Sequence, residues 1–340
     1  MSKNKKKRVA IVGYGNVGRG AIMAINNTPD MELAGIISRS PERVKKSLSD
    51  SSINVYPMCQ AESAIQEMQA DIAILCGGSK KDLPEQGPVF AQFINTVDSY
   101  DNHSCIPQYF AAMDSAASAS KHLAVISTGW DPGVFSLERV LANSFLAGAK
   151  PYGFYGLKPQ GGLSMGHSDA LRTIPGIKDA RQFTHAIPAA IEKVKSGTNP
   201  TFKPGDMHTR ECYVVLEENA NKDKIIETIK TMPGYFEPYK TTINFVSEEE
   251  LLKKFGGFPH DGCVVASSTI GVESAKHSAN IEYRCSWGSN PEATGNILVA
   301  HARACMRLAK DGRTGAATIL DIPAAYFSPF TRDELLKNLM

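Results

Sequence analysis

Three glycines near the N-terminus have the spacing of a turn that binds phosphate. Gly13, Gly15 and Gly18 directly follow the apolar segment Val9–Val12 and open a segment with helical periodicity. In such a turn the first glycine allows the tight bend, the second lets the backbone approach a pyrophosphate, and the third lets helix and strand pack closely. The helix N-terminus adds free N–H groups and the positive end of its dipole. The pattern predicts dinucleotide binding, with a purely structural turn as the alternative.

The end of the second predicted strand indicates which dinucleotide is bound. Leu33–Ser38 is followed by Arg39 and Ser40, at the position where proteins specific for NAD usually carry an acid for the ribose 2′-hydroxyl. A guanidinium between two hydroxyls would bind a 2′-phosphate, which an acid would repel. The sequence therefore predicts NADP, the alternative being that Arg39 stacks on adenine or faces water.

Loops of small or polar residues follow three further apolar segments. Cys76–Ser79 has paired glycines that allow close passage over a cofactor, Asp98–His103 is polar, and Thr128–Pro132 contains an acid before proline. Ligands of open α/β sheets bind beyond the carboxyl ends of the strands. A single loop of this kind is usually a solvent-exposed connection without a function in binding. Three of them at one edge of a sheet predict a ligand-binding site.

The elements that position these loops alternate as β-α-β units. This alternation predicts a Rossmann-type, doubly wound parallel sheet with helices on both faces, because its strands read as continuous apolar runs. The expected strands are Arg8–Val12, Leu33–Ser38, Asp71–Cys76, Asn95–Asp98 and Leu123–Ser127, and the expected helices are Arg19–Asn27, Ala61–Met68, Glu85–Phe93, Cys105–Lys121 and Phe135–Leu146.

After residue 130 and the helix Phe135–Leu146 that follows it, the pattern changes to longer alternating segments between Gly- and Pro-rich loops. It predicts a second, α+β domain over residues 131–290, with antiparallel strands and two helices. The strands are expected at Glu211–Leu216, Thr241–Val246, Gly262–Ser268 and Ala279–Trp287, and the helices at Asp223–Lys230 and Glu248–Phe255. A long helix, Pro291–Lys310, is expected to return to the first domain, so that residues 291–340 complete residues 1–130.

Composition and charge exclude several classes of partner. The formal charge of +2 is too small for the clustered cations that nucleic-acid binding needs. No apolar stretch approaches the roughly 20 residues of a membrane span, and the basic leader Lys3–Arg8 lacks the apolar region of a signal peptide, so a cytoplasmic protein is expected. Seven scattered cysteines without Cys-x-x-Cys spacing indicate reduced thiols and no metal site.

Several longer motifs together resemble one family, the meso-diaminopimelate dehydrogenases. The motifs are Val97–His103, Ser127–Gly133, Gly166–Arg172, Thr231–Pro233, Phe258–His260 and Ser289–Pro291, together with the glycine turn and Ser38-Arg39. The resemblance runs along nearly the whole chain. It implies a homodimer that oxidatively deaminates the D-configured centre of meso-2,6-diaminoheptanedioate with NADP. The products would be L-2-amino-6-oxoheptanedioate, ammonia and NADPH, with reductive amination as the reverse reaction.

The resemblance also implies which residues contact the ligands, and it makes the second domain the one for substrate binding and dimerisation. The cofactor contacts would be Gly13, Tyr14, Gly15, Asn16, Val17, Ser38, Arg39, Ser40, Cys76, Gly77, Gly78, Ser79, Ser99, Tyr100, Asp101, Thr128, Gly129, Trp130, Asp131 and Pro132. The substrate contacts would be Asp101, Asp131, Tyr155, Met165, Gly166, Thr184, Arg210, His260 and Asn290.

The chemistry of these side chains fits a ligand with two carboxylates and two ammonium groups. Arg210 can bind a carboxylate through two parallel hydrogen bonds, helped by His260 and Thr184, while Asn290 offers both a donor and an acceptor. Asp101 and Asp131 can pair with ammonium and take a proton, which makes them the candidate catalytic residues. Which of the two takes the proton stays open.

Two positions depart from the pattern of the family, where Trp is expected at Tyr155, Gln at Met165, and a shorter loop between them. A flexible thioether in place of an amide weakens polar selection, so we hypothesise that other 2-oxo acids are also aminated. Two alternatives remain: another NADP oxidoreductase, acting on a semialdehyde or a sugar, and a non-catalytic regulator that binds NADP.

Overall fold

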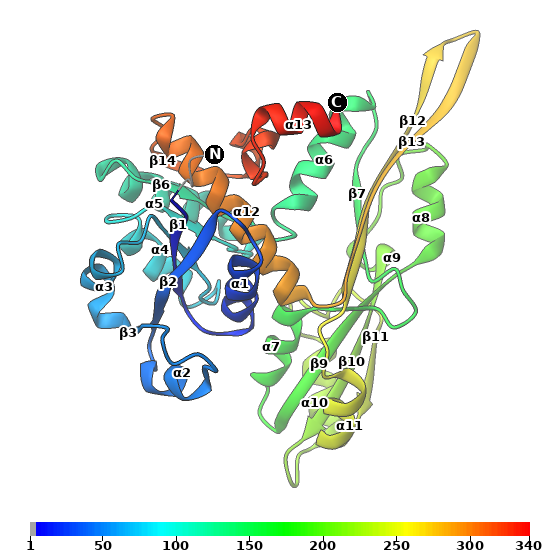
Figure 1. Ribbon diagram of the computed structural model, residues 1–340. Coiled ribbons are helices and arrows are strands. Elements are labelled where there is room, and N and C mark those ends of the chain that lie inside the picture. Colours follow the sequence, from blue (N-terminus) through cyan, green and yellow to red (C-terminus); the bar gives the residue numbers. More distant parts are fainter. Residues whose placement is uncertain (1–4) are drawn as a thin grey trace. The chain divides into compact units, whose positions relative to one another are not determined.

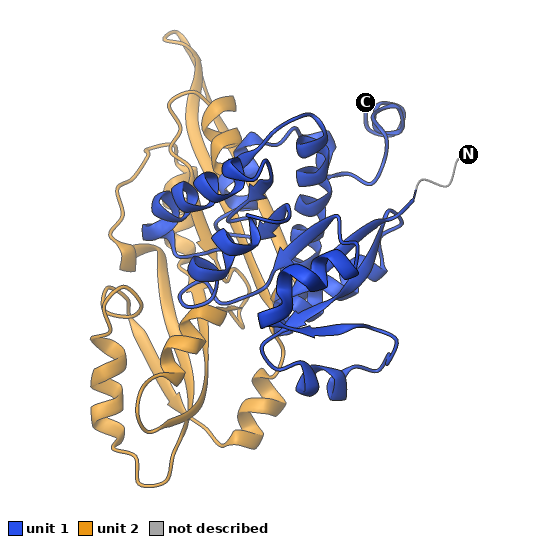
Figure 2. Ribbon diagram, turned by 90° about the vertical axis from the view of Figure 1, so that its left-hand side faces the viewer, with its two compact units in different colours: residues 1–137, 291–340 blue, residues 138–290 orange. Residues whose placement is uncertain are grey.

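The computed structural model describes residues 5–340, so Lys3 of the basic leader lies outside the described residues. The chain forms two compact units (Figure 2): unit 1 runs to Leu137 and includes Pro291–Met340, and unit 2 is Glu138–Asn290. The change of unit lies inside helix α6 (Val134–Phe145), later than the boundary expected after residue 130.

Unit 1 is built on one seven-stranded sheet in which all paired strands are parallel. The strand order is β14-β6-β5-β4-β1-β2-β3, so the order reverses between β1 and β4, where such sheets bind ligands. This confirms the Rossmann-type sheet. The bounds are β1 Lys7–Val12, β2 Met31–Ser38, β3 Val55–Pro57, β4 Ile72–Leu75, β5 Thr96–Asp98, β6 Leu123–Val125 and β14 Gly315–Ala317. Sequence analysis missed the short strands β3 and β14.

Helices cover both faces of this sheet (Figure 1). One buried core joins Ile11 and Ile74 to Ile25 of α1 and Leu298 of α12, and the other joins Leu75 to helices α3 to α5. Side chains of one strand alternate between these cores, which is why the strands are apolar throughout. The bounds are α1 Asn16–Asn26, α2 Pro41–Ser47, α3 Ala61–Glu67, α4 Leu83–Phe90, α5 Ile106–Ala119, α12 Asn290–Lys310 and α13 Arg332–Leu339.

Unit 2 contains two sheets. The first has the order β11-β10-β9-β8 and the second β13-β12-β7. The strands are β7 Tyr152–Tyr155, β8 Gly162–Leu163, β9 Ile177–Ala186, β10 His208–Leu216, β11 Thr241–Phe245, β12 His260–Val272 and β13 Ala275–Trp287. The helices that lie wholly within the unit are α7 Met165–Arg172, α8 Pro188–Lys195, α9 Pro204–Met207, α10 Lys222–Lys230 and α11 Glu248–Phe255. These elements confirm the α+β domain.

The expectation that all strands of this domain are antiparallel is wrong for β11. It pairs with β10 in parallel, from Arg210 opposite Thr241 to Val214 opposite Phe245. Parallel neighbours need a crossover connection, and α10 lies in the segment that joins these two strands. A helix between two strands was the signal for this pairing.

The hairpin β12–β13 is longer than the sequence indicates. Both strands have 13 residues and pair to Val272 opposite Ala275, whereas the strands were expected to end at Ser268 and to begin at Ala279. Its outer part extends beyond β7 (Figure 1) and exposes Ile270 and Val272. With no buried face there, the hydrophobic pattern that marks a strand is absent.

Candidate functional site

The turn between β1 and α1 has the geometry of a phosphate-binding turn. Gly13 has a φ of 96°, and a Cβ on Gly18 would lie 2.1 Å from the carbonyl oxygen of Gly13, so the fold itself requires both glycines. Gly15 is different, because a Cβ there would meet no atom within 4 Å. It precedes the first residue of α1, so the open space lies at a helix N-terminus, which fits a pyrophosphate.

Arg39 is held by a residue that sequence analysis missed. Its Nη1 lies 2.9 Å from Oδ1 of Asp82, while Oδ2 of Asp82 accepts a hydrogen bond of 2.9 Å from the backbone N–H of Gly78. Asp82 therefore joins the loop after β2 to the loop after β4. The Arg39 side chain is 69% exposed, so its guanidinium remains accessible to a phosphate. Asp82 precedes α4, but the sequence gives no sign that it faces Arg39.

The three loops expected at the sheet edge are brought together in unit 1. The backbone N–H of Asp101 donates to Oγ of Ser79 at 3.1 Å, which joins the loops after β5 and β4. The backbone N–H of Thr128 donates to the carbonyl oxygen of Asp98 at 2.9 Å, which joins the loops after β6 and β5. Asp131 follows in the same loop as Thr128 and is linked to Pro132 by a cis peptide bond.

Arg210 is a buried cation on the β9–β10 pair in unit 2. It lies opposite Thr184, donates from Nη1 to the Thr184 hydroxyl, and places its guanidinium 4.0 Å from the centre of the Tyr239 ring. Only 8% of its surface is exposed, and no carboxylate within residues 5–340 forms an ion pair with it. Burial lowers the pKa of Arg210. Because an uncompensated buried charge is costly, this arrangement fits an anionic ligand.

Two neutral histidines flank Tyr155. Nε2 of His208 accepts a hydrogen bond of 3.0 Å from the backbone N–H of Tyr155, and the rings of Tyr155 and His260 are nearly parallel at 6.4 Å. Burial, with a smaller contribution from Arg210, lowers the pKa of His208 to about 3, and burial lowers the pKa of His260 to about 4. Arg210 is therefore the cation of this group. Sequence analysis missed His208, although it lies two residues before Arg210 on β10 and thus on the same face.

The remaining substrate candidates lie on neighbouring segments. Met165 and Gly166 begin α7 just after β8, and a Cβ on Gly166 would meet no atom within 4 Å. The backbone N–H of Leu163 donates to Pro259, and that of Asn290 donates to Phe258 at 2.8 Å. The 258–260 loop thus connects Asn290 with β8, so unit 2 gathers its candidates around β8, β9, β10 and the start of β12.

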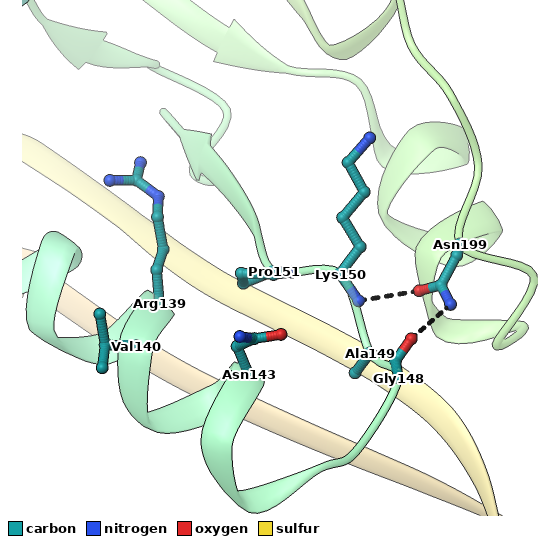
Figure 3. Close-up of a pocket in the computed structure, with 8 residues that line it drawn as sticks. All are labelled: Arg139, Val140, Asn143, Gly148, Ala149, Lys150, Pro151 and Asn199. Carbon is teal, nitrogen blue, oxygen red and sulfur yellow. Dashed lines mark hydrogen bonds between the residues drawn. The ribbon is translucent and has the colours of Figure 1, made fainter.

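A hollow of about 520 Å³ in unit 2 lies apart from these residues. Arg139, Lys150 and Asn199 are among the residues that line it (Figure 3), and none of the expected site residues does. Asn199 accepts from the backbone N–H of Lys150 and donates to the carbonyl oxygen of Gly148, both at 2.9 Å. The shape of the hollow thus follows from hydrogen bonds that join Asn199 to the segment of Gly148 and Lys150.

Comparisons with known proteins match both the N-terminal and the later part of the chain to known families. A family profile described as the diaminopimelic acid dehydrogenase C-terminal domain matches residues 129–289, and one described as an oxidoreductase family with an NAD-binding Rossmann fold matches residues 7–94. A meso-diaminopimelate D-dehydrogenase of Ureibacillus thermosphaericus is 46% identical over 336 residues, which are 98% of this chain and 99% of that protein. The chain belongs to the diaminopimelate dehydrogenase family.

Solved structures of this family share the fold. C. glutamicum diaminopimelate dehydrogenase in complex with diaminopimelate has a TM-score of 0.90 at 38% identity, covering 99% of this chain and 100% of that one. An engineered D-amino acid dehydrogenase bound to NADP⁺ has a TM-score of 0.87 at 37% identity, with the same coverage. The family resemblance drawn from the motifs is confirmed.

The described residues add two observations on metal and membrane. Within residues 5–340, no three His, Cys, Asp or Glu side chains are grouped so that they could hold a metal ion. Over the same residues, each helix is too short or too polar to cross a membrane.

Proposed function

We propose that the protein is an NADP-dependent meso-diaminopimelate dehydrogenase. It oxidises the D-configured CH–NH₃⁺ centre of the substrate and adds water, which releases L-2-amino-6-oxoheptanedioate and ammonia in its protonated form, NH₄⁺. Two electrons and one proton leave as hydride, and a further proton goes to solvent. Membership of the family and the diaminopimelate in the related C. glutamicum structure support this assignment.

The loops of unit 1 would hold the cofactor. The open space at Gly15 fits the pyrophosphate, and Arg39 provides a cation for the 2′-phosphate. Bound NADP⁺ supplies the hydride acceptor. The remaining candidates on the loops after β2, β4, β5 and β6 would line the nicotinamide half and the ribose groups. The NADP⁺ bound to the engineered relative supports the choice of cofactor.

The observation that carries the substrate proposal is the buried guanidinium of Arg210 without an acidic partner. It would bind one substrate carboxylate. The hydroxyl of Thr184, which accepts a hydrogen bond from Arg210, and neutral His260 would be further hydrogen-bonding groups. Tyr155, Met165, Gly166 and Asn290 would complete the wall. Asp101 and Asp131 would bind the reacting ammonium and accept its proton, because hydride leaves readily only from the neutral amine.

The test is NADP reduction with meso-, LL- and DD-diaminopimelate and with D-alanine. Turnover of the meso isomer, and NADPH oxidation in reverse that requires ammonia, are expected. NADPH consumption without ammonia would instead favour a semialdehyde or sugar oxidoreductase, and tight NADPH binding without any turnover would favour a regulator.

A variant pair tests the role of Arg210. Arg210→Met should raise the KM for diaminopimelate by at least ~10-fold and leave the affinity for NADPH unchanged, since one charge-assisted contact is worth about 1.5–3 kcal/mol. Arg332→Met at the exposed start of α13 is the matched control. An unchanged KM in Arg210→Met would refute the carboxylate role.

We further propose a homodimer and a broadened range of 2-oxo acids. The dimer rests on the family resemblance and is tested by light scattering. The wider range rests on Met165 and Tyr155, and reductive amination of pyruvate and phenylpyruvate above background would support it. A cytoplasmic location stays a prediction from the sequence.

A further inference from the structure

The loops that carry Asp101 and Asp131 are tied to one buried carboxylate that belongs to neither the cofactor set nor the substrate set. We propose that Asp98 is the positioning residue that fixes both loops for the reaction. This inference rests on the proposed function, because it takes Asp101 and Asp131 as the groups that bind the amine and accept its proton.

Asp98 is the last residue of β5 and is fully buried. Its Oδ1 accepts two backbone hydrogen bonds from different loops: one of 2.9 Å from Tyr100, the neighbour of Asp101, and one of 3.1 Å from Ser127. Its carbonyl oxygen accepts two more from Thr128, from the backbone N–H at 2.9 Å and from the hydroxyl at 2.8 Å. One residue thus holds the start of both loops.

Helix α5 fixes the other side of the carboxylate. Oδ2 of Asp98 accepts a hydrogen bond of 2.8 Å from the hydroxyl of Tyr109, which is itself buried. The Tyr109 ring stacks on that of Tyr100, with 4.1 Å between their centres. The loop after β5 is therefore held twice, through its backbone by Asp98 and through the Tyr100 ring by Tyr109.

The chemistry of the position explains why an acid occupies it. Two backbone N–H groups and one hydroxyl converge on the side chain, and an ionised carboxylate is the group that only accepts hydrogen bonds. Burial raises the pKa of Asp98 to about 6, while the three hydrogen bonds favour its charged form. An alanine there would leave buried donors unpaired in both loops at once, which allows both to move.

Movement of the two loops would displace both Asp101 and Asp131 from their positions for the reaction. A misplacement of about 1 Å at reacting groups can lower the rate roughly 100-fold. Asp98 touches neither substrate nor cofactor in this scheme, so its effect would act through the loops that hold Asp101 and Asp131.

The experiment compares Asp98→Ala, Asp98→Asn and Tyr109→Phe with Asp114→Ala. Asp114 is the matched control, a half-buried acid in unit 1 whose Oδ1 accepts a hydrogen bond of 2.8 Å from the backbone N–H of Ala316, away from these loops. Two readouts are used: kcat and KM for meso-diaminopimelate, and hydrogen exchange of the amides in residues 99–102 and 127–131. The second readout does not depend on activity.

We expect Asp98→Ala to lower kcat about 100-fold and to speed exchange in both loops. Asp98→Asn should stay within about 5-fold of wild type, since its amide oxygen keeps both backbone bonds and its NH₂ can donate to Tyr109. Asp114→Ala should lower the melting temperature but leave kcat and loop exchange as in wild type. If Asp98→Ala does not fold, Tyr109→Phe tests the proposal in its place. We expect this variant to show faster exchange in residues 99–102 and a smaller loss of kcat than that expected for Asp98→Ala.

Unchanged exchange in both loops of Asp98→Ala, or in residues 99–102 of Tyr109→Phe if only that variant folds, would overturn the proposal. A loss in Asp98→Asn as large as that in Asp98→Ala would also overturn it, because the carboxylate charge and not the loop geometry would then matter. Failure of the proposed function is distinguishable from failure of this inference. In that case the wild-type protein would not turn over meso-diaminopimelate, while hydrogen exchange would still test whether Asp98 holds the two loops.

Discussion

The contact between α1 and α12 depends on two glycines, and filling either one should weaken unit 1. A Cβ on Gly20 would lie 2.4 Å from the carbonyl oxygen of Pro291 and 2.9 Å from Cα of Glu292. A Cβ on Gly295 would lie 2.3 Å from the carbonyl carbon of Gly20. All of these are backbone atoms, so no side chain can rotate away to make room.

The cost of Gly20→Ala follows from that geometry. Ordinary contact begins at 3.4 Å, so the two helices must separate by about 1 Å. A gap of that size forfeits a quarter to a half of the dispersion energy of the contacts around it, and overpacking typically costs about 1–3 kcal/mol. Alanine gains up to about 1 kcal/mol of helix propensity over glycine. We expect a net loss of about 1–2 kcal/mol, or roughly 2–8 °C in melting temperature for a unit of this size.

The assay is thermal unfolding followed by circular dichroism, with Met23→Ala on the exposed side of α1 as control. Gly20→Ala should also weaken NADPH binding, since the N-terminus of α1 forms the phosphate turn. The double variant Gly20→Ala/Gly295→Ala should lose less than the sum of the single losses, because the first substitution already separates the helices. A melting temperature of Gly20→Ala at or above that of wild type would refute the reasoning.

Three further changes test other parts of the structure. Arg39→Ala should weaken NADPH binding at least ~10-fold by titration calorimetry and leave NADH binding unchanged, since only NADPH carries the 2′-phosphate; equal losses would refute this role. Asp82→Asn should make NADPH binding depend more steeply on salt, because the guanidinium loses its ion pair, and an unchanged salt slope would count against Asp82 as its holder. Burial lowers the pKa of His301 to about 4, below its ordinary 6.5, so stability is fully present above pH 6.5 and falls by about 1.4 kcal/mol per unit as pH drops from there toward 4. His301→Leu should reduce the slope by about that amount in urea unfolding between pH 7 and 4.5, with His208 and His260 still contributing to the remainder, and a slope equal to that of wild type would show that His301 does not titrate there.

Much of the fold could be predicted because its signals are local. Strand, glycine turn and helix follow one another around Gly13, and each predicted strand of unit 1 is short and apolar because both of its faces are buried. Two of the misses share a cause, the lack of a local hydrophobic pattern. The outer part of β12–β13 has no buried face, and β14 is three residues of Gly and Ala without a hydrophobic pattern.

The sequence by itself determined the glycine turn between β1 and α1, the cation that follows β2 and the family, because residue types at fixed spacings carry that information. Only the tertiary structure decided that Asp82 meets Arg39, that His208 stands beside Tyr155, and that Asp98 joins two loops. The partners in the Asp98–Ser127, Arg39–Asp82 and Tyr155–His208 contacts are separated by 29 to 53 residues in the chain. Such contacts form only when the chain adopts its tertiary structure. No local pattern of hydrophobicity or turn residues encodes which distant residues will become hydrogen-bond partners.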